Sequence, residues 1–273
     1  MEIASTRRLL AVIISALIAF STALTVSSFV IGSTLGSQEF FSSNAVTGGI
    51  ASQCEEQLSA KYKALEAQSG IPASVFETVK LEYPIDISLK TAFQNIFSSE
   101  NPELYNDALV EHFETLCTDY LDGNKKNYNK EYIRNTAEEA ARIFSETAGL
   151  HNMGTAADKI AAIKNRCHLY TLIGIIADAL LVLLLLMLFG KFKRCAIYVF
   201  GSVAGGMTGT AAAALLCKVM SPLRTLNITP EIYKEAMISV FGKSMLYLAA
   251  ASVLAAAVSW TAALIYYKQH NKK

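Results

Sequence analysis

The sequence predicts an all-α membrane protein with four transmembrane helices and a helical-bundle extracytoplasmic domain between the first and second. Charge is scarce, because Asp, Glu, Lys and Arg make up only 17% of the chain, against about 25% in soluble domains. The deficit is confined to four nearly charge-free stretches, 9–32, 169–190, 195–217 and 244–267. Each is long enough to cross the roughly 30 Å hydrocarbon core of a bilayer as a helix.

The first span, in residues 1–32, begins with Arg7 and Arg8 and continues as an apolar run. A signal peptide also starts this way, but its apolar region usually has only about 7–15 residues. We therefore expect an uncleaved span; cleavage would leave three spans. Residues 33–49 are rich in Ser, Gly and Thr, which predicts a linker with Phe40 and Phe41 on the membrane surface.

Residues 50–168 predict a helical domain of ordinary polarity. Apolar residues recur at three- and four-residue steps in 50–68, 103–121 and 131–148, which is the helical period. Prolines and glycines between these stretches indicate breaks and short turns. The apolar stripe of the first stretch is Ile50, Cys54, Leu58, Tyr62 and Leu65. That of the second is Leu104, Tyr105, Ala108, Leu109, His112, Phe113, Leu116, Cys117 and Tyr120. That of the third is Tyr132, Ile133, Ala137, Ala140, Ala141, Phe144 and Ala148. A further helix from Thr155 has no breaker before the second span, so we expect one continuous helix over 155–190.

Asp178 stands near the middle of the second span. A carboxylate is costly there unless it is protonated or has a partner. One interpretation is a functional residue in proton or ion transfer or in a subunit contact, and the other is a neutral Asp hydrogen-bonded within the bundle. The hydroxyls expected at comparable depth are those of Ser202, Thr208, Ser252 and Ser259.

Residues 169–273 predict a three-helix transmembrane region with an amphipathic outer loop, 218–243. Gly201, Gly205 and Gly209 share one face of the third span, and small residues at this spacing let helices approach closely. We therefore expect the third and fourth spans to be tight neighbours. A short amphipathic helix beginning near Thr229 is expected to lie on the outer membrane surface or to pack under the outer domain.

The basic residues of the short loops predict the orientation. One side would hold eight Lys or Arg residues, in the N terminus, the 191–194 turn and the C terminus, and the loop 218–243 holds four. Lys164 and Arg166 weaken this contrast. The positive-inside rule places the richer side in the cytoplasm. We therefore expect a multi-pass protein of the cell membrane with cytoplasmic N and C termini and residues 33–168 extracytoplasmic.

No residue pattern predicts a catalytic, cofactor-binding or metal site. Cys54 and Cys117 could form a disulfide outside the cell or remain buried free thiols. His112 lies near Glu111, Glu114 and Cys117, but their spacing does not present a ligand set, which favours a bundle-edge histidine. The segment 50–168 has 12 Lys or Arg and 18 Asp or Glu residues, a net charge of −6, which argues against nucleic acid as a partner.

Three segments resemble a group of uncharacterised four-pass membrane proteins of Gram-positive bacteria. They are SGIPASVFETV (69–79), NPELYNDALVEHFETL (101–116) and the basic turn KFKR (191–194). The resemblance implies the same architecture, with an all-helical outer domain after the first span, in a cell with a single membrane. It implies no activity and no site residues.

Together these observations predict a non-enzymatic sensor, adaptor or subunit whose outer helical domain binds a partner or ligand. The alternative is a small oligomeric transporter or ion-coupled accessory that uses Asp178. The predicted partners are the lipid bilayer and either another protein or further copies of this chain.

Overall fold

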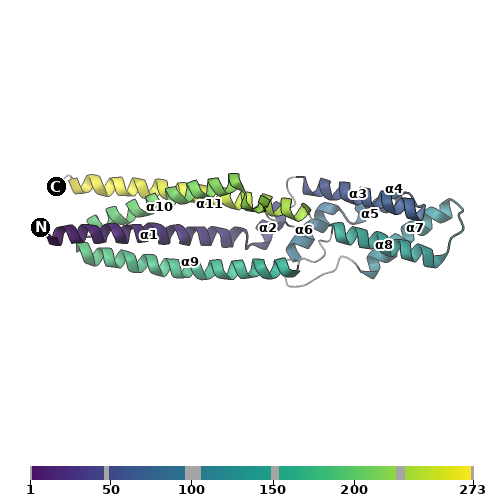
Figure 1. Ribbon diagram of the computed structural model, residues 1–273, viewed down its shortest axis with the longest axis horizontal. Helices are drawn as coiled ribbons and strands as arrows, with labels where there is room; N and C mark the ends of the chain where they lie inside the picture. The colour runs from purple at the N-terminus through teal and green to yellow at the C-terminus, as the bar shows by residue number, and fades with distance from the viewer. Residues whose placement is uncertain (1, 46–48, 96–105, 149–153, 226–230, 272–273) are drawn as a thin grey trace. The chain divides into compact units, whose positions relative to one another are not determined.

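The computed structural model describes residues 2–45, 49–95, 106–148, 154–225 and 231–271, and these are almost entirely helical (Figure 1). The chain forms two compact units. Unit 1 comprises residues 1–37, 162–226 and 241–273, and unit 2 comprises residues 38–161 and 227–240. The α-helices are α1 (Glu2–Thr34), α2 (Gln38–Ala45), α3 (Ile50–Ser69), α4 (Ala73–Glu77), α5 (Val79–Glu82), α6 (Ile85–Asn95), α7 (Asp107–Gly123), α8 (Lys130–Ala148), α9 (Gly154–Phe189), α10 (Phe192–Met220) and α11 (Glu231–Asn271), with a 3₁₀ turn at Pro222–Thr225.

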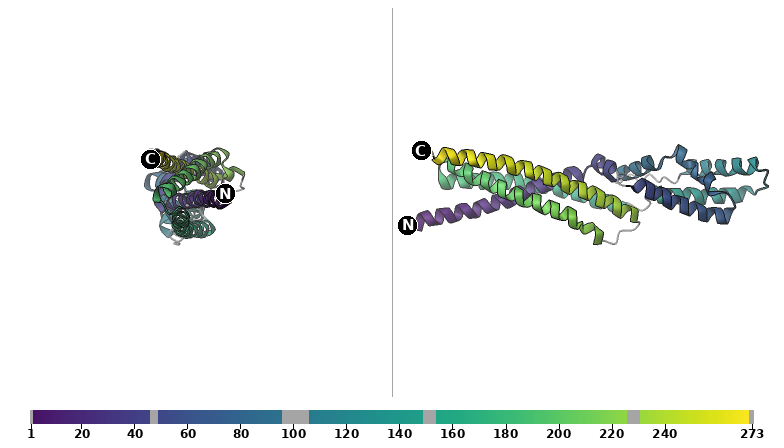
Figure 2. Two further views of the ribbon diagram at one scale, coloured as in Figure 1. Left: turned by 90° about the vertical axis from the view of Figure 1, so that its left-hand side faces the viewer. Right: turned by 90° about the horizontal axis from the view of Figure 1, so that it is seen from above.

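Among the described residues, four helices are long and apolar enough to cross a membrane, the number that the sequence predicts. These segments are Thr6–Thr34, Ala162–Phe189, Phe192–Thr225 and Lys234–Gln269. The long helices of unit 1 lie side by side in both views (Figures 1 and 2). Many of their Leu, Ile and Val side chains point outward and are about half exposed, as expected for helices whose outer faces contact lipid tails.

In unit 1, α1 and α9 pack antiparallel through small residues. A Cβ atom added at Gly174 of α9 would lie 2.0 Å from the Oγ1 atom of Thr25 in α1. Nearer the end of α1, a Cβ added at Gly32 would lie 3.1 Å from the Cβ of Cys167. A Cβ at Gly174 would require the Thr25 hydroxyl to rotate away and its Cβ, at 3.1 Å, to give slightly, so glycine favours this close approach.

The contact between α1 and α10 depends on Gly206 and not on the glycines expected from their spacing. A Cβ atom at Gly206 would lie 2.5 Å from the backbone oxygen of Ala19. At Gly201, Gly205 and Gly209 an added Cβ would meet no described atom within 4 Å. The buried face of α10 contains Ala204, Met207, Ala211 and Ala214, whose side chains fill the space against neighbouring helices, whereas the three-glycine face has nothing to bury.

The fourth helix of unit 1 belongs to the same apolar core as α1 and α10. Val30 of α1 and Ala214 of α10 form a buried cluster with Met245, Leu248 and Ala249 of α11. A second cluster joins α1, α9 and α10 through Ala11, Ile18, Leu185 and Cys195. Thus α1 shares a buried cluster with each of the other three long helices, a central role that its sequence did not indicate.

The predicted division of residues 218–267 into an amphipathic helix and a separate span is wrong. One helix, α11, runs from Glu231 to Asn271, because Gly242 alone does not stop a helix between two apolar segments. Its first turns belong to unit 2, where Ala236 and Val240 are buried and the hydroxyl of Ser239 donates to the carbonyl of Asn44 at 3.3 Å. Of the two placements expected for this segment, packing against the helical domain is the one observed.

Unit 2 is a bundle of short helices with an aromatic core. Tyr62, Phe76, Phe113 and Phe144, from four different helices, are almost fully buried. The Tyr62 ring lies 5.5 Å from Phe76 and 6.2 Å from Phe113, centroid to centroid. The predicted stripe of α3 is confirmed, since its buried residues are Ile50, Cys54, Leu58, Tyr62 and Leu65. Gly70 ends this helix in the left-handed conformation, as its position predicted.

Two details of unit 2 differ from prediction. The expected linker 33–49 contains a helix, α2, which packs against α6. Phe41 of α2 is buried in unit 2 instead of resting on a membrane surface, because it gains more by covering the apolar face of α6. On α6 itself Ile85 and Leu89 are buried and Ile87 is exposed.

The two units differ sharply in charge. Unit 1 contains 13 Lys or Arg and 2 Asp or Glu residues, a net charge of +11. Unit 2 contains 11 Lys or Arg and 21 Asp or Glu residues, a net charge of −10. The overall charge of +1 therefore hides a basic membrane-type bundle and an acidic helical domain.

Candidate functional site

The helical domain has a charged groove between α3 and α8, with a volume of about 230 Å³. Ala64, Leu65 and Ile143 supply apolar lining, and charged side chains surround it. The groove residues are Lys61, Ala64, Leu65, Gln68, Glu139, Arg142, Ile143 and Glu146. An apolar surface with charges of both signs around it is typical of sites that bind another protein or a polar ligand.

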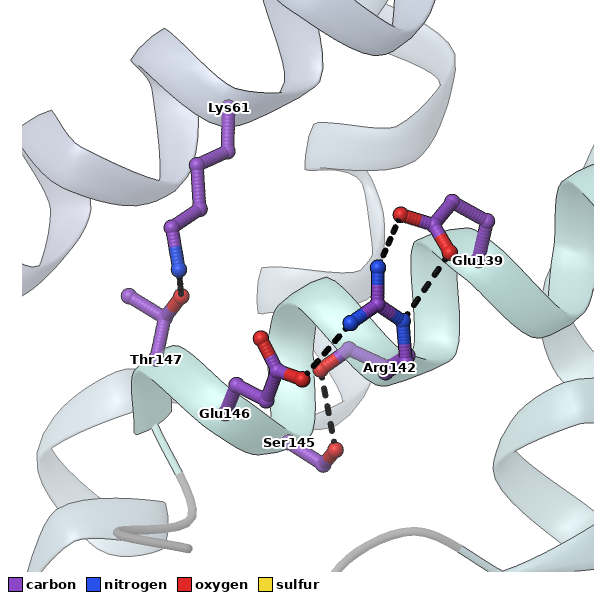
Figure 3. Close-up of polar contacts among 6 residues, drawn as sticks. All are labelled: Lys61, Glu139, Arg142, Ser145, Glu146 and Thr147. Atoms are coloured by element: carbon purple, nitrogen blue, oxygen red, sulfur yellow. Dashed lines mark hydrogen bonds and ion pairs between the residues drawn. The ribbon is translucent and has the colours of Figure 1, made fainter.

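Arg142 is the central charge of the α3–α8 groove (Figure 3). Its guanidinium is held on one side by Glu139, through nitrogen–oxygen contacts of 2.5 Å and 3.0 Å, and on the other by Glu146 at 2.9 Å. The hydrogen bond and charge of Glu139, followed by the charge of Glu146, raise the pKa of Arg142. The side chain is 54% exposed, so these pairs position the guanidinium toward solvent more than they stabilise the fold.

Lys61 is the second cation of the groove, and it reaches across from α3 to α8 (Figure 3). Its ammonium donates to the Oγ1 atom of Thr147 at 3.1 Å. Nearby, the thiol of Cys54 donates to the backbone oxygen of Thr147 at 3.3 Å. These two contacts hold one end of the groove together and leave further donor capacity on Lys61, which has three N–H groups.

The sequence interpretation missed this groove, although a signal was present. The segment Glu139-x-x-Arg142-x-x-x-Glu146 places two carboxylates three and four residues from one guanidinium, a spacing that brings them together on a helix surface. The position of Lys61 opposite this segment depends on the packing of α3 on α8, and the sequence pattern does not predict that packing.

Cys54 and Cys117 are both buried and free in the structure, which is the second of the two expected alternatives. Burial raises the pKa of Cys54 to about 11, with a smaller contribution from the charge of Glu55. Burial also raises the pKa of Cys117 to about 12, with help from Glu114. Both thiols therefore stay neutral and unreactive in the folded domain.

His112 lies at the edge of the bundle, as expected, with a partner that was not foreseen. Its Nδ1 atom is 2.7 Å from a carboxylate oxygen of Glu82 in α5, and its ring meets Tyr83 edge-on at 5.9 Å. This pair joins α5 to α7 and follows from no local sequence motif. Among the described residues no three His, Cys, Asp or Glu side chains are grouped to hold a metal ion.

Asp178 of α9 lies against α1, and its neighbours differ from those predicted. The hydroxyl groups of Ser21 and Thr22 are the polar side-chain groups that interact with its carboxyl. Two of the expected partners instead donate within their own helix, Ser202 to Tyr198 at 2.6 Å and Thr208 to Ala204 at 2.8 Å. The close approach at Gly174 explains the difference, because it brings the hydroxyl-bearing face of α1 against this part of α9.

One oxygen of the Asp178 carboxyl remains unsatisfied. Oδ1 is buried and makes no hydrogen bond to any described residue. A charged Asp at the centre of a bilayer costs about 2.5–3.5 kcal/mol on insertion scales, so this group is the most demanding polar feature of the four spans. The run of hydroxyl residues Ser21, Thr22 and Thr25 in the first span was a usable signal for its location.

No family model, curated protein or solved structure matches this chain.

Proposed function

We propose that the protein is a non-enzymatic membrane sensor, adaptor or subunit whose helical domain binds a protein partner or ligand. The observation that carries this proposal is the α3–α8 groove. Its cations and carboxylates lie around a small groove whose apolar lining, Leu65 and Ile143, is itself mostly buried. The groove thus offers a pattern of both charges by which a partner can be recognised.

Replacing Arg142 with Glu tests this role. The change puts a third carboxylate between Glu139 and Glu146, so we expect at least a tenfold loss of a stoichiometric partner in pull-downs of the detergent-solubilised full chain. Arg134→Glu is the matched control, since Arg134 also lies on α8 and pairs with Glu138 at 3.2 Å, but it does not line the groove. Equal partner recovery with both variants would refute binding through this groove.

We further propose that the helical domain is extracytoplasmic and that both termini are cytoplasmic. The four candidate spans and the eight basic residues of the termini and the 191–194 turn support this orientation. The resemblance to four-pass membrane proteins of Gram-positive bacteria implies the same arrangement. A ligand or partner of the domain would then come from the cell envelope or the surroundings.

Thiol labelling of intact cells tests the orientation. In a background with Cys167, Cys195 and Cys217 replaced by Ala, we expect Asn127→Cys to react with a membrane-impermeant maleimide without lysis. Asn127 is exposed in the loop between α7 and α8. Lys193→Cys is the opposite control and should react only after lysis. If the two sites exchange these behaviours, the proposed orientation is inverted.

A second candidate function is a small oligomeric transporter or ion-coupled accessory. The face of α10 with Gly201, Gly205 and Gly209 favours it, because this face packs against no described part of the chain. Glycines spaced by four residues can bring two membrane helices into close contact. A second copy of the chain could dock there, and four spans per copy would then be enough to enclose a polar path.

A further inference from the structure

The surface along which α1 packs against α9, the α1–α9 seam, contains a polar group whose role the two proposed functions leave unspecified. Asp178 lies near the middle of its span, beside Ser21 and Thr22 of α1. One carboxyl oxygen, Oδ1, is buried without a hydrogen bond to any residue described in the structure. The single proton of the Ser21 hydroxyl is directed to the backbone oxygen of Gly174, which lies one helical turn from Asp178 on α9, at 3.4 Å.

No charged side chain is placed to neutralise this carboxyl. Residues 9–34 of α1, 195–217 of α10 and 244–267 of α11 contain no Asp, Glu, Lys, Arg or His, and Asp178 is the only such residue in 169–189 of α9. The groups facing it from the packed helix are therefore hydroxyls, which can donate a hydrogen bond but cannot carry a compensating charge. The negative charge of a carboxylate in this setting must be neutralised by a small bound cation.

The ligand that fits best is a proton. Hard metal cations take about six or more oxygen ligands, whereas the described oxygens around Asp178 are its own two, the two hydroxyls and the carbonyl of Gly174. The seam is also closed, since the Thr25 side chain fills the space beside Gly174. A proton needs no additional ligands, and the protonated carboxyl becomes a hydrogen-bond donor.

The site is reachable from lipid. Asp178 itself is partly exposed, and its neighbours Ile175, Ile176 and Leu180 are more than half exposed on the outer surface of α9. In a membrane this surface faces hydrocarbon, so a small apolar molecule can approach the carboxyl sideways through the bilayer.

We propose that Asp178, with Ser21 and Thr22 as positioning residues, forms an exchangeable proton-binding site in the α1–α9 seam. The carboxyl binds and releases a proton, and the two hydroxyls donate to the carboxylate when the proton has left. This site requires neither the α3–α8 groove nor oligomer formation, so its test is separate from the tests of partner binding and of self-association. It deepens the second candidate function, which would use Asp178.

Dicyclohexylcarbodiimide, an apolar reagent that modifies protonated carboxyls, tests the site in membranes containing the full-length chain. Mass spectrometry of the α9 peptide should show modification of Asp178 at pH 6 and a decline as the pH rises. Sodium, exchanged for choline at constant ionic strength, should have no effect. Asp178→Asn should abolish the modification of this peptide.

The positioning role has its own readout. In the double variant Ser21→Ala, Thr22→Val the carboxylate loses two hydrogen-bond donors, so modification should persist to a pH about one unit higher. An unchanged pH profile would remove these two residues from the site.

Two outcomes would overturn the proton site itself. One is protection by sodium, which would identify a sodium site instead. The other is that Asp178 of the wild-type chain is not modified at any pH. The positive control is the double variant Asp178→Asn, Ala179→Asp, which has a single carboxyl on the exposed face of the same turn and should be modified.

Discussion

Gly206→Val is expected to prevent stable assembly of unit 1, whereas Gly205→Val should leave it folded. A Cβ atom at Gly206 would lie 2.5 Å from the backbone oxygen of Ala19, and a backbone atom cannot rotate away as a side chain can. Overpacking of this kind destabilises by about 3 kcal/mol or more when the helices must separate. At Gly205 the added side chain meets no described atom within 4 Å.

The thermal unfolding midpoint of the full-length chain is measured in a mild detergent, by monitoring the loss of monodisperse protein as the temperature rises. The adjacent glycines make a matched pair, since they differ by one residue and receive the same substitution. Gly205→Val carries a second expectation, the loss of self-association, if its face of α10 binds another copy. Similar unfolding midpoints for wild type and Gly206→Val would contradict the packing of α1 on α10.

Phe113→Ala is expected to destabilise unit 2 by about 3–5 kcal/mol, the usual range for removing a large buried aromatic side chain. Phe113 is 0% exposed and its ring contacts Tyr62 and His112 edge-on. Alanine would leave a cavity, and side chains from the neighbouring helices could fill it only by moving inward. Leu81→Ala is the control, because Leu81 is 86% exposed and should change stability by no more than about 0.5 kcal/mol.

The labelling rate of the two buried thiols, Cys54 and Cys117, measures this destabilisation in the full-length chain. Folding raises the pKa of Cys54 from 9.0 to about 11 and that of Cys117 from 9.0 to about 12, so at pH 8 both react slowly until the domain opens. Phe113→Ala should accelerate their labelling by a factor on the order of 10²–10³. Labelling rates equal to those of Leu81→Ala would show that Phe113 contributes little to the core.

The same thiols give the sign of the pH dependence. Because folding raises their pKa values, their contribution to stability is fully present below pH 9 and is lost as the pH rises through about 11 and 12. The labelling experiment therefore belongs near pH 8, where the folded domain keeps this contribution.

Much of the helical domain could be predicted from the sequence because apolar periodicity reports burial directly. The stripe of α3 is a clear example, and α8 follows its predicted stripe except at Tyr132, which is exposed. On α7 Leu109, Phe113 and Cys117 are buried as predicted, but Ala108 is exposed and Val110 and Leu121 are buried instead. The groove could not be predicted in the same way. Arg142 and its two carboxylates are local to α8, but Lys61 joins them only because Tyr62 and Leu65 turn their face of α3 toward α8.

The number of spans was predictable from length and polarity, whereas their pairing was not. Lipid and protein neighbours are equally apolar, so hydrophobicity does not say which face of α10 meets α1. Gly201, Gly205 and Gly209 matched a known pattern and were expected to be packed, yet Gly206 is the residue in contact. The partners of Asp178 were misassigned for the same reason, since they follow from the α1–α9 register.

The place of α1 in buried clusters with all three other long helices has a consequence for biosynthesis. α1 is the first of these helices to leave the ribosome, but Gly206, against which Ala19 packs, follows nearly 190 residues later. At about 5–20 residues per second, α1 must wait some 10–40 s in the bilayer with its small-residue faces uncovered. Nascent chains therefore pass through a stage in which the future centre of the bundle is open to quality-control proteases and to wrong partners.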